Sequence, residues 1–388
     1  MSRSIAIALS LLGIASSTFA QTPATRVSTP SSPTADAPEK LLSPTTQLFV
    51  RWDGITAHND AYKKSFWGGL MAGPTGGSIR TLLAEWPKLL GNSQLADPLV
   101  EGKPLEELKT TIADFKNATK IIDLIVDKGA IVGLEVREPK PTLKGVGQAL
   151  GGLFNGELPS SEILAPDVQL FVLVPNVAER AEVPFATIRQ LLAKSETKIE
   201  PFAIAGRNGF RIARSEENDS PASVSIAWWV EGKHFVLYVG TTKLETTVDG
   251  VAANARKGGI TEHPLFQQCM KNPGYESVTR GFVDTGRLIS LVKMLAGPFV
   301  PGLGQRIDDL GFGNLKSIVF NSGFEGKESR ATYEFNLPGE RKGLAKILKP
   351  QPLGLKDLPP LPPDMTRFSA LRIDPTATYD AAISVLET

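Results

Sequence analysis

Cysteine and histidine are scarce in this chain. Its 388 residues include one cysteine, Cys269, and three histidines, His58, His234 and His263. A single cysteine excludes an intramolecular disulfide. The histidines are far apart, so none of them forms the closely spaced pair that many zinc sites use. We therefore expect no bound metal and no cofactor, and we expect Cys269 to be a buried, inert thiol.

The chain also has no excess of charge of either sign. It contains 42 Lys and Arg against 41 Asp and Glu, and the two numbers become equal if Arg3 is removed with the N-terminal segment. A protein that binds nucleic acid needs a basic face to meet the phosphates, so this balance argues against nucleic acid as a partner. It argues equally against a polybasic membrane tether.

Long apolar runs are confined to the N-terminus. Arg3 precedes the apolar run Ile5–Ala15, and small residues follow it up to Ala20. This order is typical of a secretory signal peptide over residues 1–20, cleaved between Ala20 and Gln21. The run is too short to span the ~30 Å of a bilayer core, and no later segment reads as a transmembrane helix. We therefore expect the mature chain to lie in the periplasm or cell envelope.

The familiar catalytic motifs are missing or incomplete. The sequence has no Gly-x-Ser-x-Gly elbow, and Ser195–Lys198 matches Ser-x-x-Lys without its partner motifs. The glycine-rich stretch Gly73–Ser78 lacks the Lys-Ser/Thr ending of a phosphate loop, and Gly145–Gly147 lacks the third glycine of a dinucleotide fingerprint. We interpret the chain as a non-enzyme.

One element occurs three times in the sequence: a proline, a short apolar strand, a polar break and a helix. The copies open with Pro44–Phe49, Pro166–Phe171 and Pro363–Phe368. The Pro-to-Phe spacing alone would arise about once by chance, so the helices that follow carry more weight. Their apolar residues recur at helical spacing at Tyr62, Phe66 and Leu70, at Phe185, Ile188 and Leu192, and at Tyr379, Ile383 and Leu386. We interpret this element as an internal repeat.

The repeat and the composition together predict how the chain is organised. We expect a signal peptide over 1–20, a disordered Pro/Ser/Thr linker over 21–43, a first α+β module over 44–155, a second over 163–350, a Pro-rich linker over 351–363, and a partial third repeat or sheet-completing tail over 364–388. Either the chain is a fragment of a longer protein, or its tail completes an earlier sheet. Hairpin signals at Gly206–Gly209 and Glu231–Lys233 predict mainly antiparallel pairing. The predicted fold is α+β, with two modules of mainly antiparallel sheet and helices packed on one face.

The second module carries a pattern of elements that is found in a known group of proteins. A strand at His234–Gly240 precedes a helix at Thr242–Ala255, a short proline-opened helix at His263–Phe266, and a strand at Thr279–Asp284 that runs into another helix. Over about residues 163–375 the chain resembles a bacterial exported family, periplasmic proteins with a domain of unknown function. The resemblance implies fold and export, and it supplies no catalytic residues.

Two groups of residues are candidates for a binding site. Asp53, His58 and Asp60 lie at the first polar break, where Asn59 or Asp60 could instead cap the following helix. Trp228 and Trp229 are neighbours on a strand and so point to opposite faces. We expect one of them in the core, and the other as a surface platform for a sugar or a peptide.

These observations favour one function and leave two alternatives. The favoured function is an exported, non-enzymatic structural or binding protein of the bacterial envelope, whose partner is an unknown envelope protein or polysaccharide. The alternatives are a periplasmic hydrolase, which would need Asp53, His58 and Asp60 to converge in a pocket, and a carrier of an apolar ligand between sheet and helices.

Overall fold

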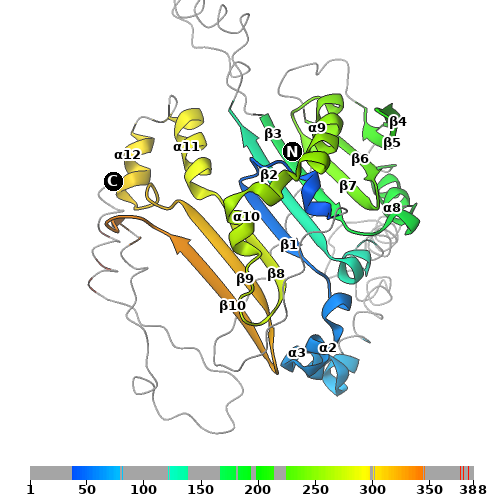
Figure 1. Ribbon diagram of the computed structural model, residues 1–388, viewed down its shortest axis with the longest axis horizontal. Coiled ribbons are helices and arrows are strands. Elements are labelled where there is room, and N and C mark those ends of the chain that lie inside the picture. Colours follow the sequence, from blue (N-terminus) through cyan, green and yellow to red (C-terminus); the bar gives the residue numbers. More distant parts are fainter. Residues whose placement is uncertain are drawn as a thin grey trace, which may run out of the picture. The chain divides into compact units, whose positions relative to one another are not determined.

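The strands that the structure describes form one antiparallel sheet (Figure 1). The computed structural model describes residues 37–78, 123–138, 167–180, 182–193, 198–213, 224–297 and 302–343, together with a few single positions. Ten strands hydrogen-bond in the order β10-β9-β8-β1-β2-β3-β7-β6-β5-β4. They are β1 (Leu48–Trp52), β2 (Ala130–Arg137), β3 (Asp167–Val174), β4 (Ile199–Ile204), β5 (Arg207–Ile212), β6 (Ser225–Glu231), β7 (His234–Gly240), β8 (Glu276–Val283), β9 (Ser317–Glu325) and β10 (Glu328–Asn336).

The α+β class and the antiparallel sheet predicted from the sequence are confirmed. The strands of the two predicted modules, however, share this one sheet, because β1 and β2 lie between β8 and β3. The boundary expected near residue 160 therefore does not divide the sheet. β2 pairs antiparallel with β1 on one side and with β3 on the other, so the first strands of the first two repeat copies flank β2.

Both predicted hairpins are present, one of them with a shifted turn. β6 and β7 join through Gly232 and Lys233, as expected. Between β4 and β5 the turn lies at Ala205 and Gly206, which both have positive φ, and not at the Asn-Gly pair that the sequence indicated. Gly209 instead lies within β5, where a Cβ would fall 2.6 Å from the ring of Phe202. Close packing across the hairpin therefore decides the register.

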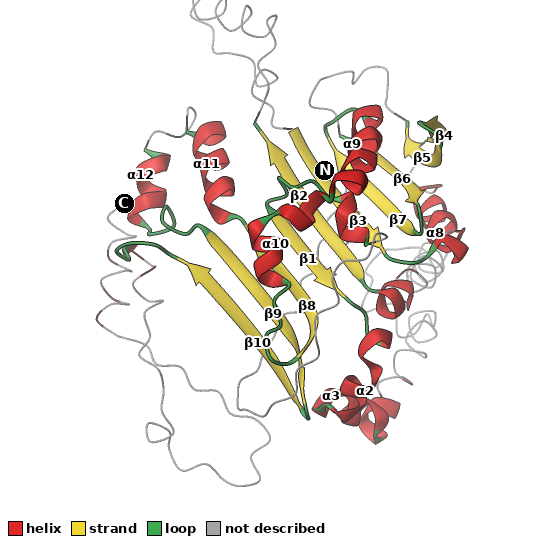
Figure 2. Cartoon of the chain, in the orientation of Figure 1, coloured by secondary structure: helices red, strands yellow, loops and turns green. Residues whose placement is uncertain are grey.

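Helices contact both faces of the sheet, although the sequence predicted one. On one face, α9 (Leu244–Lys257), α10 (Pro264–Cys269) and the short 3-10 helices η2 (Pro38–Leu41) and η7 (Gly259–Glu262) cover a core (Figure 2). That core includes Phe49, Phe171, Trp229, Phe266 and Phe282. The opposite face has a second core, to which α8 (Glu182–Ala193) contributes. Alternate side chains of β3, β6 and β7 therefore enter different cores.

The helix after the first repeat strand is broken in two. After β1 the chain forms η3 (Thr56–His58), α2 (Asn59–Lys64) and α3 (Phe66–Ala72). The second copy has the continuous predicted helix, α8, after the short η5 (Ala178–Arg180). Residues 21–36 of the first predicted linker, the whole Pro-rich linker and all but single positions of the third copy lie outside the described residues. The end of the first linker was expected to be disordered, but it forms η2, and Leu41 and Leu42 are buried in a core, so that part of the prediction is wrong.

By compactness the chain divides into two units. One unit comprises residues 1–282 and 319–333, and the other comprises 283–318 and 334–388. The second contains α11 (Thr285–Ala296) and α12 (Leu303–Asp309), which are tied together by the ion pair between Lys293 and Asp308. All the residues of the candidate site belong to the first unit.

Candidate functional site

A cluster of six charged side chains includes two of the residues singled out in the sequence. We call it the Asp53–His58 cluster; its members are Glu39, Arg51, Asp53, His58, Glu276 and Arg280. The Arg280 Nη2 atom donates to Asp53 Oδ2 at 2.9 Å. His58 Nε2 lies 3.5 Å from the same carboxylate oxygen, and His58 Nδ1 lies 2.7 Å from Glu276 Oε1. The imidazole therefore sits between two carboxylates.

The elements of the sheet bring this cluster together. Arg51 and Asp53 follow Phe49 on the same side of β1, since side chains alternate along a strand. Arg51 Nε donates to Asp53, and its guanidinium also pairs with Glu39 of η2, which is only 2% exposed. The backbone N–H of Asp53 donates to Val278 O at 2.9 Å, which places the end of β1 beside β8. The cluster thus joins residues separated by more than 200 positions.

Charge balance sets the protonation of the cluster. Burial would raise the pKa of Asp53, but the contact with His58 and the charges of Arg51 and Arg280 outweigh it and lower the pKa to about 2. The contact with Asp53 is the largest cause that raises the pKa of His58; burial opposes it, and Glu276 adds to it. With His58 protonated, three cations face three carboxylates. Loss of that proton would leave one uncompensated negative charge in a partly buried site.

This arrangement suits an ion-pair network better than acid–base catalysis. A general base needs a ring nitrogen within reach of the proton that it abstracts, and both nitrogens of His58 already face carboxylates. Asp53 with a pKa of about 2 stays ionised near neutral pH and cannot serve as a general acid there. Cys269 packs against the same face; burial raises the pKa of its thiol to about 12, and its Sγ donates to Phe266 O. Cys269 is therefore a buried thiol with little thiolate character, as predicted.

Asp60 does not join the cluster. It is exposed in α2, so the convergence of Asp53, His58 and Asp60 that the hydrolase required does not occur. The predicted cap is also wrong: Asn59 and Asp60 are the first two residues of α2, and His58 occupies the N-cap position without a capping bond from its side chain. The ring of His58 is drawn instead toward Asp53 and Glu276.

Neither tryptophan forms the surface platform that the sequence suggested. Trp228 and Trp229 do point to opposite faces of β6, as alternation requires, but each has 0% exposure. Trp228 packs in the core with α8, and Trp229 packs in the core with α9. The expectation of one exposed ring was wrong because both faces of the sheet are covered. The indole N–H of Trp229 donates to Glu231, at 3.3 Å.

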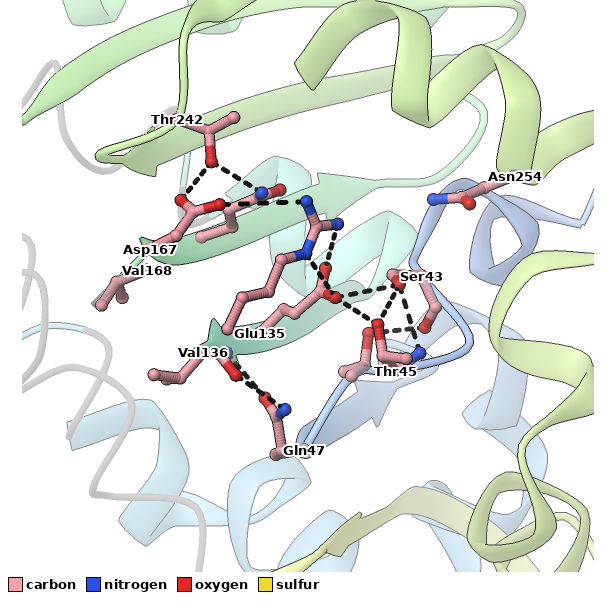
Figure 3. A network of polar contacts seen from close by, with 12 residues as sticks. Ser43, Thr45, Gln47, Glu135, Val136, Asp167, Val168, Thr242 and Asn254 are labelled. Atoms are coloured by element: carbon pink, nitrogen blue, oxygen red, sulfur yellow. Dashed lines mark hydrogen bonds and ion pairs between the residues drawn. The ribbon is translucent and has the colours of Figure 1, made fainter. Parts of the chain in front are cut away.

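A second polar network lies at the end of β2 (Figure 3). Glu135 is 2% exposed and accepts two hydrogen bonds from the guanidinium of Arg137, at 2.8 and 2.9 Å. The hydroxyls of Ser43 and Thr45, from the loop ahead of β1, also donate to Glu135. Figure 3 shows both of them pointing toward its carboxylate. The buried charge is thus compensated by an arginine and by two hydroxyl donors.

Equivalent positions of the first two repeat copies contribute to this network. Thr45 and Asp167 each follow the opening proline by one position; Thr45 donates to Glu135, and Asp167 lies 3.9 Å from Arg137. Gln47 and Gln169 each follow it by three. Gln47 exchanges two hydrogen bonds with the backbone of Val136, and Gln169 donates to Thr242 at 2.7 Å. The repeated segment therefore fastens each copy beside β2.

Several residues of these networks carried a signal in the sequence that was not used. Arg51, Glu135 and Arg280 are charged residues inside strands, each next to an apolar residue or a glycine in the sequence. A charge at an inward position of a strand must be paired, because burial of an isolated charge is costly. Each of the three is indeed part of a carboxylate–guanidinium contact. Their partners Glu39 and Glu276 come from segments distant in the sequence and gave no comparable sign.

The described residues provide neither a metal site nor a membrane-spanning helix, and comparison with known proteins finds no similar one. Among the described residues, no group of three or more His, Cys, Asp or Glu side chains could hold a metal ion. Within the same part of the chain, no helix has the length and apolar character needed to cross a membrane. The chain matches no family model, and no curated protein or solved structure matches it.

Proposed function

We propose that the protein is exported and acts in the bacterial envelope as a non-enzymatic structural or binding component. Its partner in this proposal is an envelope protein or a polysaccharide, and not a nucleic acid. The apolar run Ile5–Ala15 and the small residues before Gln21 support export. The resemblance of residues 163–375 to a bacterial exported family supports the same location.

The observation that carries the non-enzymatic part is the double engagement of His58. Its two ring nitrogens contact Asp53 and Glu276, so the one histidine found beside a candidate carboxylate has no nitrogen turned toward a nucleophile. Glu135 is engaged in the same way by Arg137 and by hydroxyl donors. In the Asp53–His58 cluster, Glu39 Oε2, His58 Nε2 and Arg280 Nε lack a hydrogen-bond partner among the described residues, so its charges are paired without every polar atom being hydrogen-bonded.

Export can be tested by the N-terminus of the protein in cells. We expect periplasmic extract from a bacterium that expresses the whole gene to contain the chain beginning at Gln21, as determined by intact mass. A chain that retains residues 1–20 and remains in the cytosolic fraction would overturn the proposed location.

The absence of catalysis can be tested with a matched pair of variants. Wild type, His58→Gln and the exposed control Asp60→Asn are compared on chromogenic ester, peptide and glycoside substrates. We expect the same background rate for all three. Turnover that is lost in His58→Gln and retained in Asp60→Asn would overturn the non-enzymatic assignment and favour a hydrolase.

A further inference from the structure

Two adjacent aromatic side chains project into solvent at the start of α3. Phe66 is 59% exposed and Trp67 is 49% exposed, and their rings meet edge to face with centroids 5.7 Å apart. Exposed large apolar side chains that gather together mark interaction sites more often than single ones do. Most of the other large aromatics that the structure describes in this unit lie in the two cores.

The turn between α2 and α3 holds these two rings outward. The hydroxyl of Ser65 donates to Tyr62 O at 2.6 Å and accepts from the backbone N–H of Gly68 at 3.1 Å. At Gly68 a Cβ would lie 1.9 Å from Tyr62 O, so only glycine lets the two helices approach this closely. Phe66 and Trp67 stand between these two contacts, on a corner whose backbone is fixed.

The corner is also fastened to the sheet. The backbone N–H of Phe66 donates to Lys327 O at 3.0 Å, in the turn between β9 and β10. The ring of Tyr62 lies edge-on to that of Phe324, with centroids 6.1 Å apart. Figure 1 shows α2 and α3 beside this end of the β9–β10 hairpin. The exposed rings of Phe66 and Trp67 therefore lie on a corner that is hydrogen-bonded to, and packed against, the β9–β10 hairpin.

Three exposed lysines belong to the segments that form this corner. Lys63 and Lys64 directly precede the corner, and Lys327 is the residue whose carbonyl holds Phe66; all three are exposed. None of them forms an ion pair with another described residue. Two exposed acids, Asp60 and Glu328, are near them in the sequence, so the excess of positive charge is small. The aromatic rings must then supply the larger part of any binding.

We propose that this corner, formed by Lys63, Lys64, Phe66, Trp67 and Lys327, is a contact site for the surface of an anionic phospholipid bilayer. Tryptophan favours the interfacial layer of a membrane, where its N–H stays hydrated and its ring contacts the apolar part, and phenylalanine is typical of the apolar face of segments that lie on a membrane. Lysines beside them meet the lipid phosphates and add attraction to an anionic surface. A peripheral contact of this kind needs no membrane-spanning helix. Its biological setting rests on the proposed envelope location.

Vesicle binding tests this site on the complete protein. Wild type and variants are purified with the same N-terminus, checked by intact mass, and sedimented with vesicles of phosphatidylethanolamine and phosphatidylglycerol. Pure phosphatidylcholine vesicles serve as the neutral comparison. We expect wild type to bind the anionic vesicles more tightly, and Phe66→Ser/Trp67→Ser to lose at least about tenfold in affinity. Lys63→Gln/Lys64→Gln should lose about fivefold per lysine, and only on anionic vesicles.

A matched control removes an equally exposed aromatic from elsewhere in the same unit. Tyr333 on β10 is 52% exposed, and Tyr333→Ser should bind as wild type does. Equal binding by wild type and the Phe66→Ser/Trp67→Ser variant would overturn the proposal. Equal binding of wild type to anionic and neutral vesicles would overturn its electrostatic part.

A second measurement reports on Trp67 itself. The chain has five tryptophans, of which Trp228 and Trp229 are fully buried, so the contribution of Trp67 is read as the difference between wild type and Trp67→Phe. Brominated lipids should quench the tryptophan fluorescence of wild type more than that of Trp67→Phe. Unchanged fluorescence of bound wild type would exclude contact through Trp67. Failure of vesicle binding would leave an N-terminus at Gln21 unaffected, so the two proposals can fail separately.

Discussion

Neutralising Asp53 should remove a measurable part of the stability of the unit that contains β1. Its pKa falls from an ordinary value of 3.8 to about 2 in the folded protein. A difference of that size corresponds to about 2 kcal/mol of folding free energy, since one pKa unit is about 1.4 kcal/mol. The Asp53 side chain is 10% exposed, so solvent screening reduces this figure little. Asp53→Asn should therefore lower the free energy of unfolding by about 2 kcal/mol near neutral pH.

The stability that Asp53 contributes should decrease as the pH falls. Because the folded pKa is lowered, the contribution is present above about pH 4 and is lost as the pH falls toward about 2. The difference between wild type and Asp53→Asn should follow the same course and vanish at the acid end. Wild type should thus become as labile as the variant once Asp53 is protonated.

Urea unfolding followed by tryptophan fluorescence measures this difference. Trp228 and Trp229 are fully buried in the same compact unit as Asp53, so their emission reports on that unit. Asp60→Asn is the matched control, because it removes the same charge from an exposed position nearby and should change stability by less than about 0.5 kcal/mol. A loss that does not depend on pH, or one equal to that of Asp60→Asn, would refute the reasoning from charge pairing.

Three further changes test other parts of the structure by the same unfolding measurement. The pKa of His58 is raised in the folded protein, so its contribution to the free energy of unfolding is present below about pH 6.5 and is lost as the pH rises through the folded pKa. The stability lost in His58→Gln should therefore shrink as the pH rises over that range. A loss of stability that does not change with pH would contradict the charge balance. Glu135→Ala should cost about 3 kcal/mol because it leaves buried donors unpaired, whereas Glu138→Ala at the exposed end of the same segment should cost less than about 0.5 kcal/mol. Gly281→Ala should destabilise by at least about 1 kcal/mol, because its Cβ would lie 2.3 Å from a backbone oxygen of β1. Gly250→Ala in α9 meets open space and should stabilise by up to about 1 kcal/mol; equal effects of the two glycine changes would contradict the strand packing.

The paired charged groups that these predictions test also bear on the proposed function. The Asp53–His58 cluster joins η2, the β1 end and the β8 start, and the Glu135 network joins the entries of two repeat copies to β2. Both networks lie where segments distant in the sequence must meet. We therefore regard them as devices that fix the order and register of the strands, while the exposed corner at α3 offers a surface to a partner.

Local patterns in the sequence determined most individual elements. The repeated entry located β3 and α8, the hairpin signal at Glu231–Lys233 located β6 and β7, and the order of elements after β7 located α9 and α11. The proline entry also has structural meaning, since its first two copies lead into β1 and β3. These features depend on residues close together in the chain, so their signal is contained in short windows.

The sequence also brought Asp53 and His58 forward as candidates, but it assigned them the wrong neighbours. Asp60 is adjacent in sequence and yet points into solvent, whereas Arg280 and Glu276 lie more than 200 positions away and complete the cluster. Only strand pairing could supply that information, because the contact of β1 with β8 involves no local motif.

What the sequence alone determined is thus the balance of charge, the apolar run near the N-terminus, the α+β class and the repeated strand entry. The tertiary structure decided that the strands of both predicted modules form one sheet, that Trp228 and Trp229 are both buried, and that Phe66 and Trp67 are exposed. The physical reason is the same in each case. Whether a side chain is buried depends on which distant segment packs over it. The residues next to it in the chain do not determine that packing.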